Sequence, residues 1–435
     1  GRHRDRLGPR DRTYLEARLS AAPRSSRETI ETYEQLTRDL PDRVEAWYVL
    51  GDARLHSPLD PGPDWDEQTR AAFQRALDLD PNYFPATQHL TFLLLGKRRP
   101  GELQATMLRL RELSPSSVHP FHRGLEEGTG ILTLDVDAIR SYLPISLALA
   151  AGVHLETSDE APQDFLPFVE TAVAERKRRA VDGRELRAAL IAEYHVELSL
   201  GRSERAQAAR ERLIREFDEA RLGQAAIDEA LWSVGSLEDG EASVVAIDER
   251  LQSQSPESFV ANNVAELANA EIWRFARDPD YRGRGAEARI LQAMPGFQHP
   301  ERLQVEAYAR MLEAWSRTRA GLPAAGESVA RVEEILLQQF MNRRLLFAMA
   351  RIHEERGEYD QALRMLDRRV RFSGFVSPYE VTFWREEGRL AAQAGDTGRA
   401  VRAYERYLKA RQDADSRVMP EVDSVRAELA RLEAG

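Results

Sequence analysis

Residues 384–407, WREEGRLAAQAGDTGRAVRAYERY, carry the strongest structural signal in this chain. Gly395 and Ala400 lie five positions apart in the middle of this stretch. A glycine ends a helix in a conformation that other residues resist, and a small alanine one turn into the next helix lets two backbones approach closely. The stretch therefore predicts two helices that are joined by a tight turn and packed against each other.

Two patterns recur along the chain. The glycine and alanine spacing is repeated at Gly201 with Ala206 and at Gly357 with Ala362. In the second pattern, two apolar residues three positions apart are followed by a proline, as in Tyr33, Leu36 and Pro41, in Phe73, Ala76 and Pro81, and in Met107, Leu110 and Pro115. The apolar pair lies on one helical face, and the proline cannot continue the helix. Each unit is therefore expected to end with a buried apolar helix face, and its helix is expected to end before the proline.

These units follow the register of a known repeat. Trp47, Leu50 and Gly51 stand where the 34-residue tetratricopeptide pattern has its tryptophan, leucine and glycine, and Trp384 and Gly388 repeat that register. The sequence therefore predicts an all-α fold, a tetratricopeptide-like helix-turn-helix repeat solenoid with a degenerate helical middle. The expected divisions are a linker remnant at 1–12, N-terminal repeats at 13–120, degenerate helical repeats at 121–340, and C-terminal repeats with a capping helix at 341–435.

Composition excludes several classes of function. The net charge of -11 argues against a nucleic-acid-binding surface, because that affinity depends mainly on clustered positive charge. The chain has no cysteine, which removes disulfides and thiolate metal sites. Its most apolar stretch, Leu143 to Val153, has about half of the roughly 20 residues that a spanning helix needs, so we expect no transmembrane segment.

No motif in the sequence supports catalysis. Nucleophile elbows, kinase loops and dinucleotide fingerprints are absent. His353 and Glu354 match the start of the zinc-protease signature, but Gly357 stands where the second histidine should be. We therefore expect a protein that is not an enzyme, with no cofactor and no metal.

The repeat register itself predicts binding residues. In stacked helix pairs, positions 2, 5, 9 and 12 of the first helix point into the concave face. Near the C-terminus this predicts a groove that contains Arg344, Phe347, Arg351, Arg385 and Arg389. Arginine forks match carboxylates, so this groove could hold an acidic peptide. The alternative is that these arginines are solvated, since arginine is abundant throughout the chain; in either case, replacing Arg385 and Arg389 with glutamate should leave melting nearly unchanged.

The same positions predict a second groove near the N-terminus, with Glu45, Tyr48, Asp52, Gln88 and Phe92. This groove is more acidic and apolar than the C-terminal one. One ligand is therefore not expected to suit both.

The chain also resembles a known group of proteins. The resemblance is carried by RDRTYLEARL, EAWYVLGDARLHSP, AAFQRALDLDPNYFPATQHL and the C-terminal GDTGRAVRAYERYLKARQDADSRVMPEVDSVRAELARLEAG. These stretches are similar to the C-terminal repeat region of large bacterial serine/threonine protein kinases, and similar regions follow winged-helix domains in bacterial regulators. The resemblance implies a region that senses or recruits, with the catalytic domain upstream.

The sequence thus favours a non-catalytic protein- or ligand-binding repeat module that acts as sensor or scaffold of a bacterial signalling protein. Its partner is a protein or peptide, with no nucleic acid bound through this region. The alternatives are the regulatory repeat region of a winged-helix transcription factor and a stand-alone adaptor in envelope or secretion assembly. The location is cytoplasmic or, if a spanning helix lies upstream as in many such kinases, extracytoplasmic.

Overall fold

The computed structural model describes residues 6–21, 26–56, 64–96, 100–113, 183–217, 237–298, 301–336, 343–368 and 380–434, together with residues 174, 177 and 178. Within these ranges the regular structure consists of helices, and no strand is present. None of these helices combines the length and the apolar character that crossing a membrane requires. The predicted all-α helical repeat fold is confirmed.

The chain forms two compact units. The first consists mainly of Gly1–Glu160, and the second contains Ala161–Leu336, Met341–Arg369 and Val376–Gly435. The repeat boundaries that are predicted at residues 120 and 340 lie outside the described residues.

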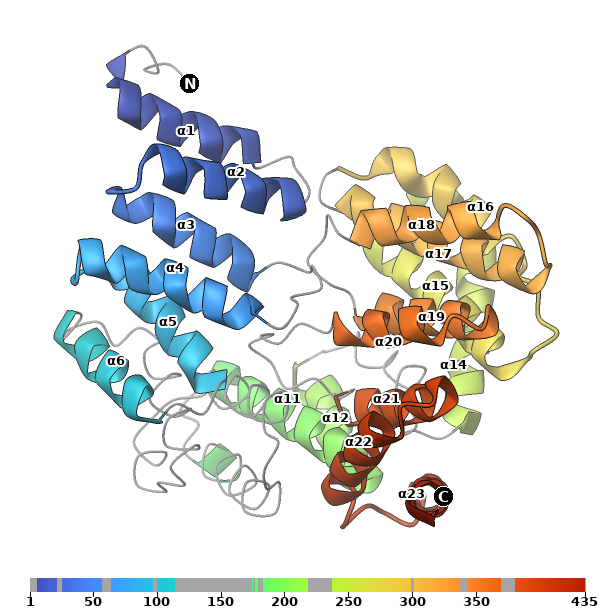
Figure 1. Ribbon diagram of the computed structural model, residues 1–435. Helices are drawn as coiled ribbons and strands as arrows, with labels where there is room; N and C mark the ends of the chain where they lie inside the picture. The colour runs from blue at the N-terminus through green and yellow to red at the C-terminus, as the bar shows by residue number, and fades with distance from the viewer. Residues whose placement is uncertain are drawn as a thin grey trace. The chain divides into compact units, whose positions relative to one another are not determined.

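The first unit is a succession of helices, each packed on the next (Figure 1). They are α1 Pro9–Ala21, α2 Ser26–Asp39, α3 Val44–Leu55, α4 Trp65–Leu79, α5 Phe84–Gly96 and α6 Pro100–Leu113. Two of them, α2 and α4, end shortly before Pro41 and Pro81, as the proline pattern predicts. Tyr33 and Leu36 are buried on one face of α2 and contribute to the core of this unit.

Helix α1 begins inside the segment that the sequence predicts as a linker remnant at 1–12. Pro9 is its first residue, where a missing N–H costs nothing because the first helical N–H groups have no partner in the helix. Ion pairs of Arg10 with Asp42 and of Arg43 with Asp11 join α1 to the start of α3. From Pro9 onward this segment is therefore helical and joined to α3 by ion pairs.

The second unit continues the pattern of helical hairpins. Its helices are α11 Gly183–Leu200, α12 Ser203–Phe217, α14 Leu237–Gln252, α15 Ala261–Arg277, α16 Ala286–Ala293, α17 Glu301–Arg319, α18 Ala325–Leu336, α19 Arg343–Glu355, α20 Tyr359–Asp367, α21 Glu380–Ala394, α22 Thr397–Ala410 and α23 Met419–Ala434. The predicted helix-ending glycines have positive φ, at 75° for Gly201, 73° for Gly357 and 81° for Gly395. This left-handed conformation favours glycine, so the glycine pattern marked real turns.

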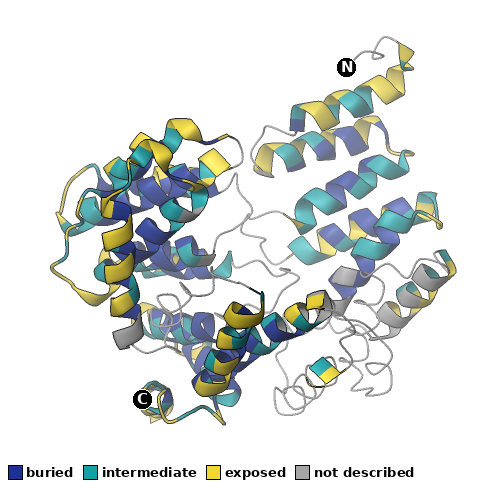
Figure 2. Ribbon diagram, turned by 180° about the vertical axis from the view of Figure 1, so that it is seen from behind, coloured by how far each residue is buried: buried dark blue, intermediate teal, exposed yellow. Residues whose placement is uncertain are grey.

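A continuous apolar core links α14 to α22 in the second unit. Its buried residues lie on the helix faces that meet, and exposed residues cover the outer faces (Figure 2). Phe275 and Trp315 stack within it, with ring centroids 4.9 Å apart. The described part of the middle segment is thus held together by the same helix-on-helix packing as the clearer repeats.

Arg411 joins the earliest described helices of this unit to the last ones. This residue directly follows α22, and its side chain is fully buried. Its guanidinium donates a hydrogen bond to the carbonyl oxygen of Leu198 at 2.9 Å. Nearby, Asp415 accepts hydrogen bonds from the backbone N–H of Glu204 and the hydroxyl of Ser203. These polar contacts fix α11 and α12 against the C-terminal repeats.

Candidate functional site

The predicted binding positions lie on first helices of neighbouring hairpins. In the first unit, α3 carries Glu45, Tyr48 and Asp52, and α5 carries Gln88 and Phe92. In the second unit, α19 carries Arg344, Phe347 and Arg351, and α21 carries Arg385 and Arg389. Each predicted set is therefore divided between two helices.

In the second unit, the arginines form an ion-pair network that we call the arginine ladder: Arg351, Glu354, Arg385, Glu386, Arg389 and Glu421. Arg389 of α21 reaches Glu354 of α19 at 2.7 Å and Glu386 at 2.9 Å. Arg351 of α19 reaches Glu386 at 2.9 Å. Arg385 donates to Glu386 at 2.7 Å and also pairs with Glu421.

The ladder is electrically balanced and largely shielded from water. It joins three guanidinium groups to three carboxylates, and the side chain of Glu386 is only 4% exposed. Burial alone would raise the pKa of Glu386, but the charges of Arg351, Arg389 and Arg385 outweigh it and hold this pKa far below its usual range. Arg351, Arg385 and Arg389 are therefore not simply solvated, because each forms ion pairs with carboxylates of the protein.

Phe347 does not line a groove. It is buried against Phe383, with ring centroids 4.0 Å apart. Position 5 of this first helix therefore faces the core, because the aromatic pair fills the space between α19 and α21. Arg344 is half-buried at the beginning of α19.

In the first unit, the predicted groove residues Glu45, Tyr48, Asp52 and Gln88 are partly exposed, and Tyr48 belongs to an aromatic cluster. The ring of Tyr48 lies 5.6 Å from that of Tyr83 and 5.4 Å from that of His89, measured between centroids. Burial and the nearby Asp52 carboxylate raise the pKa of Tyr48 to about 12. Glu45 pairs with Arg43 at 3.2 Å, and Gln88 is half-buried.

The side chain of Phe92, which is predicted for the same groove, lies outside the described residues.

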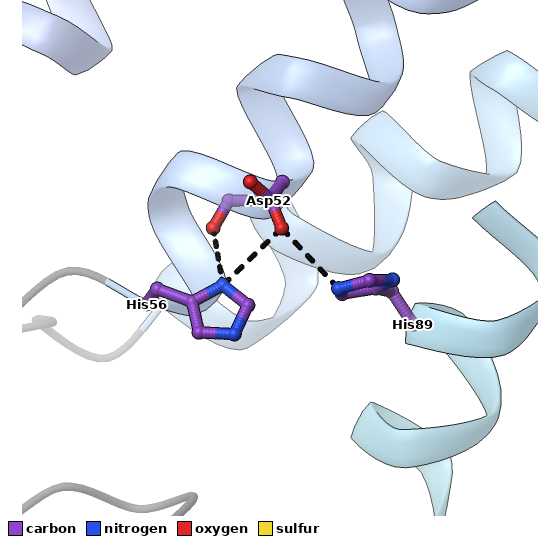
Figure 3. Close-up of side chains that lie close together, drawn as sticks. All are labelled: Asp52, His56 and His89. Carbon is purple, nitrogen blue, oxygen red and sulfur yellow. Dashed lines mark hydrogen bonds and ion pairs between the residues drawn. The ribbon is translucent and has the colours of Figure 1, made fainter. Parts of the chain in front are cut away.

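Asp52 is the centre of a cluster with two histidines, which we call the Asp52 cluster: Asp52, His56 and His89 (Figure 3). Its Oδ1 lies 3.3 Å from Nδ1 of His56 and 3.2 Å from Nε2 of His89. Nδ1 of His56 also lies 2.9 Å from the backbone oxygen of Asp52.

Charge in this cluster is unevenly matched, because one carboxylate serves two imidazoles. Burial would raise the pKa of Asp52, but the hydrogen bonds and charges of His56 and His89 outweigh it and hold this pKa well below its usual range. The hydrogen bond to Asp52, opposed by burial, raises the pKa of His56. The cluster thus stabilises positive charge next to an ionised carboxylate.

Sequence reasoning identified Asp52 as a groove residue but missed both histidines. One signal was local: Asp52 and His56 are four residues apart, so their side chains meet on one helical face. His89 comes from the next first helix, and only the repeat register could have pointed to it.

Comparison with known proteins supports the repeat assignment. Residues 14–84 and 347–416 match the sequence profile of the tetratricopeptide repeat family. The first segment contains α2, α3, α4 and most of α1, and the second contains α20, α21, α22 and most of α19. Tetratricopeptide repeats generally mediate protein–protein interaction and scaffolding, and the fold is typically non-enzymatic.

Solved structures of low sequence identity cover nearly the whole chain. Yeast Tom70 is 13% identical over 98% of this chain and 95% of its own, with a TM-score of 0.33. The tetratricopeptide domain of P58(IPK) is 8% identical over 98% and 99%, with a TM-score of 0.21, and a structure of Naa15/Naa10 bound to HypK-THB is 12% identical over 94% and 71%, with a TM-score of 0.22. These weak likenesses give no information on what this chain binds. The sequence matches none of the curated proteins.

Proposed function

We propose that this chain is a non-catalytic protein-binding repeat module that acts as a sensor or scaffold. The observation that carries the proposal is the pair of repeat segments, residues 14–84 and 347–416, that match the tetratricopeptide repeat family. A scaffold of stacked hairpins offers side chains on a rigid backbone, and rigid presentation lowers the entropic cost of binding.

The N-terminal surface is the favoured contact for a partner. Glu45, Tyr48, Asp52 and Gln88 are all partly exposed there, and the side chain of Asp52 is 35% exposed. Two acidic groups beside aromatic rings suit a peptide with basic and apolar side chains. This surface therefore offers both charge and apolar contact area.

An acidic partner for the C-terminal positions remains a separate proposal. Among the ladder arginines, Arg351 has the most exposed side chain, at 36%. A partner carboxylate would have to replace Glu354 or Glu386 as its neighbour. Such an exchange gains little net charge interaction, because one carboxylate only takes the place of another.

The wider context is proposed from the resemblance of the repeat stretches. In that arrangement the chain is the sensing or recruiting region of a bacterial signalling protein, next to a kinase or a winged-helix domain. A stand-alone adaptor role is the remaining alternative. The sequence encoded upstream of Gly1 distinguishes these three, because a kinase, a winged-helix domain and a start codon are mutually exclusive there.

The test is peptide selection by the full chain. Immobilised protein is presented with a peptide library of graded net charge, and the affinity of selected peptides is measured for the parent and for Glu45→Gln with Gln88→Ala. The matched control is Glu31→Gln with Gln74→Ala, which makes the same changes at exposed positions of α2 and α4. We expect about a tenfold loss of affinity, equal to roughly 1.4 kcal/mol, in the first variant only.

Equal binding by both double variants would show that the partner contacts another surface. A parent chain that selects no peptide would contradict the proposed function.

A further inference from the structure

The Asp52 cluster is built from two neighbouring first helices of the N-terminal repeats. Asp52 lies in the last turn of α3, and His56 follows the last residue of that helix. His89 lies on α5, which packs on α3. Donor atoms from separate turns and separate helices thus converge on one place (Figure 3).

The distances within the cluster fit a metal coordination shell. Ligand atoms of a tetrahedral zinc site lie about 2.0–2.2 Å from the ion, which places them roughly 3.3–3.6 Å from one another. Oδ1 of Asp52 lies 3.2 Å from Nε2 of His89, close to the edge of such a shell. Nδ1 of His56 lies 2.9 Å from the backbone oxygen of Asp52 and therefore carries the hydrogen, so His56 would bind a metal through Nε2 after its ring has turned. One candidate donor atom of each residue lies within 4.8 Å of those of the other two, so side-chain rotations would complete the shell.

The orientation of His89 is that of a metal ligand. Its Nδ1 lies 2.9 Å from the backbone oxygen of Pro85, and a carbonyl oxygen can only accept, so Nδ1 carries the hydrogen and donates it. Histidines that bind metals usually donate their second ring N–H in this way, which fixes the tautomer.

With its hydrogen on Nδ1, His89 turns Nε2 toward Oδ1 of Asp52, 3.2 Å away. The two atoms are therefore placed as neighbouring ligand atoms for one cation.

The donor set selects the class of ion. Two imidazole nitrogens with one carboxylate oxygen form an open zinc site, which leaves a fourth position for water or another donor. Calcium and magnesium prefer shells of oxygen ligands, which this cluster does not supply. We propose that Asp52, His56 and His89 form a binding site for one divalent transition-metal ion of the zinc class; this goes beyond the protein-binding function and does not depend on it.

The experiment measures metal binding by the full chain after treatment with a chelator. Zn²⁺ is titrated into the parent protein by calorimetry, and Co²⁺ is added separately to record the visible absorption bands of a tetrahedral site. We expect binding by the parent. Asp52→Asn and His89→Gln each remove a proposed metal ligand. Each should weaken Zn²⁺ binding by more than the loss of an outer hydrogen-bond partner does, which costs roughly 10–100-fold in affinity.

His353→Gln is the matched control, because His353 also contacts two carboxylates, those of Glu333 and Glu358, but lies outside the cluster. It should bind Zn²⁺ as the parent does. His56→Gln, at a more exposed position, provides a third ligand variant, and circular dichroism verifies that every variant keeps its helical content.

Two results would overturn the proposal. One is a parent chain that binds neither Zn²⁺ nor Co²⁺, which would leave the cluster as an ion-paired contact only. The other is unchanged affinity in folded Asp52→Asn, His56→Gln and His89→Gln, which would place the metal at other histidines of the chain.

Discussion

The Asp52 cluster and the arginine ladder occupy equivalent positions in two repeats. Asp52 stands at position 9 of its repeat and His89 at position 6 of the next; Arg351 and Glu386 hold the same two positions in the second unit. The acid and the base have simply exchanged places. In both units the repeat geometry makes positions 9 and 6 of successive first helices meet.

What differs is how completely each contact is satisfied. In the ladder, bidentate guanidinium groups and carboxylates balance one another in a mostly buried setting. In the Asp52 cluster, one carboxylate faces two imidazoles, whose charge depends on a proton or a bound cation. The same backbone position can therefore serve stability in one repeat and remain available for a ligand in another.

The largest expected effect is that of the double substitution Arg385→Glu with Arg389→Glu. It would leave Glu354, Glu386 and Glu421 facing two further carboxylates in a shielded place. Removing one partner of a buried pair typically costs about 3–5 kcal/mol, so we expect a loss of at least that size in the free energy of unfolding. Chemical denaturation measures this loss, and hydrogen exchange shows whether α19 to α22 are the helices that open.

A matched control for this prediction is Arg426→Glu, at an ion pair whose arginine is 53% exposed. It should cost about 1 kcal/mol or less. If the double variant melted like the parent, as solvated arginines would allow, the ladder would not be structural and the contrast between the units would disappear.

An intermediate effect is expected at the glycines that both units place at position 8 of a first helix. A Cβ atom added to Gly388 would lie 2.5 Å from the ring of Tyr404, and one added to Gly51 would lie 2.7 Å from the ring of Phe73. Both rings are fully buried, so Gly388→Ala and Gly51→Ala should each lower the free energy of unfolding by about 1–3 kcal/mol. Thermal and chemical denaturation measure both.

Gly398→Ala serves as the control within α22, because the nearest atom is the end of the flexible Arg402 side chain at 3.4 Å. It should be neutral or stabilising by about 0.4–1 kcal/mol. A tolerated Gly388→Ala would mean that α21 and α22 can separate without cost, against the close packing of the two helices.

The smallest expected effect is that of Asp52→Asn on the stability of the metal-free chain. Asp52 is 35% exposed and His56 is 40% exposed, and exposed ion pairs contribute about 0.2–1 kcal/mol. We expect a loss within that range in chemical denaturation with a chelator present, with Asp39→Asn on α2 as the exposed control. A loss as large as that of the ladder variant would show that the Asp52 cluster is a structural element rather than a binding site.

Much of the fold could be predicted because its signals act within one helix or one turn. The prolines 41 and 81 mark helix ends since proline lacks a donor, and Gly201, Gly357 and Gly395 mark turns since their φ is positive. The candidate sites were predictable only in part. Register placed Asp52 and Arg389 on the correct first helices, but it did not say which carboxylates or imidazoles they would meet.

Two residues show where the register fails. Phe347 stands at a groove position but packs on Phe383, because filling the apolar space between two helices outweighs the average direction of that position. His89 had no local signal, since its partner Asp52 comes from the preceding hairpin.

The sequence by itself determined the helices, their ends, the tight turns and the repeat register, because each of these depends on residues a few positions apart. Only the tertiary structure decided that the C-terminal arginines pair with carboxylates of neighbouring helices and that Asp52 contacts both His56 and His89. Those contacts join residues on different helices, and their free energy depends on burial and on the neighbours that folding supplies.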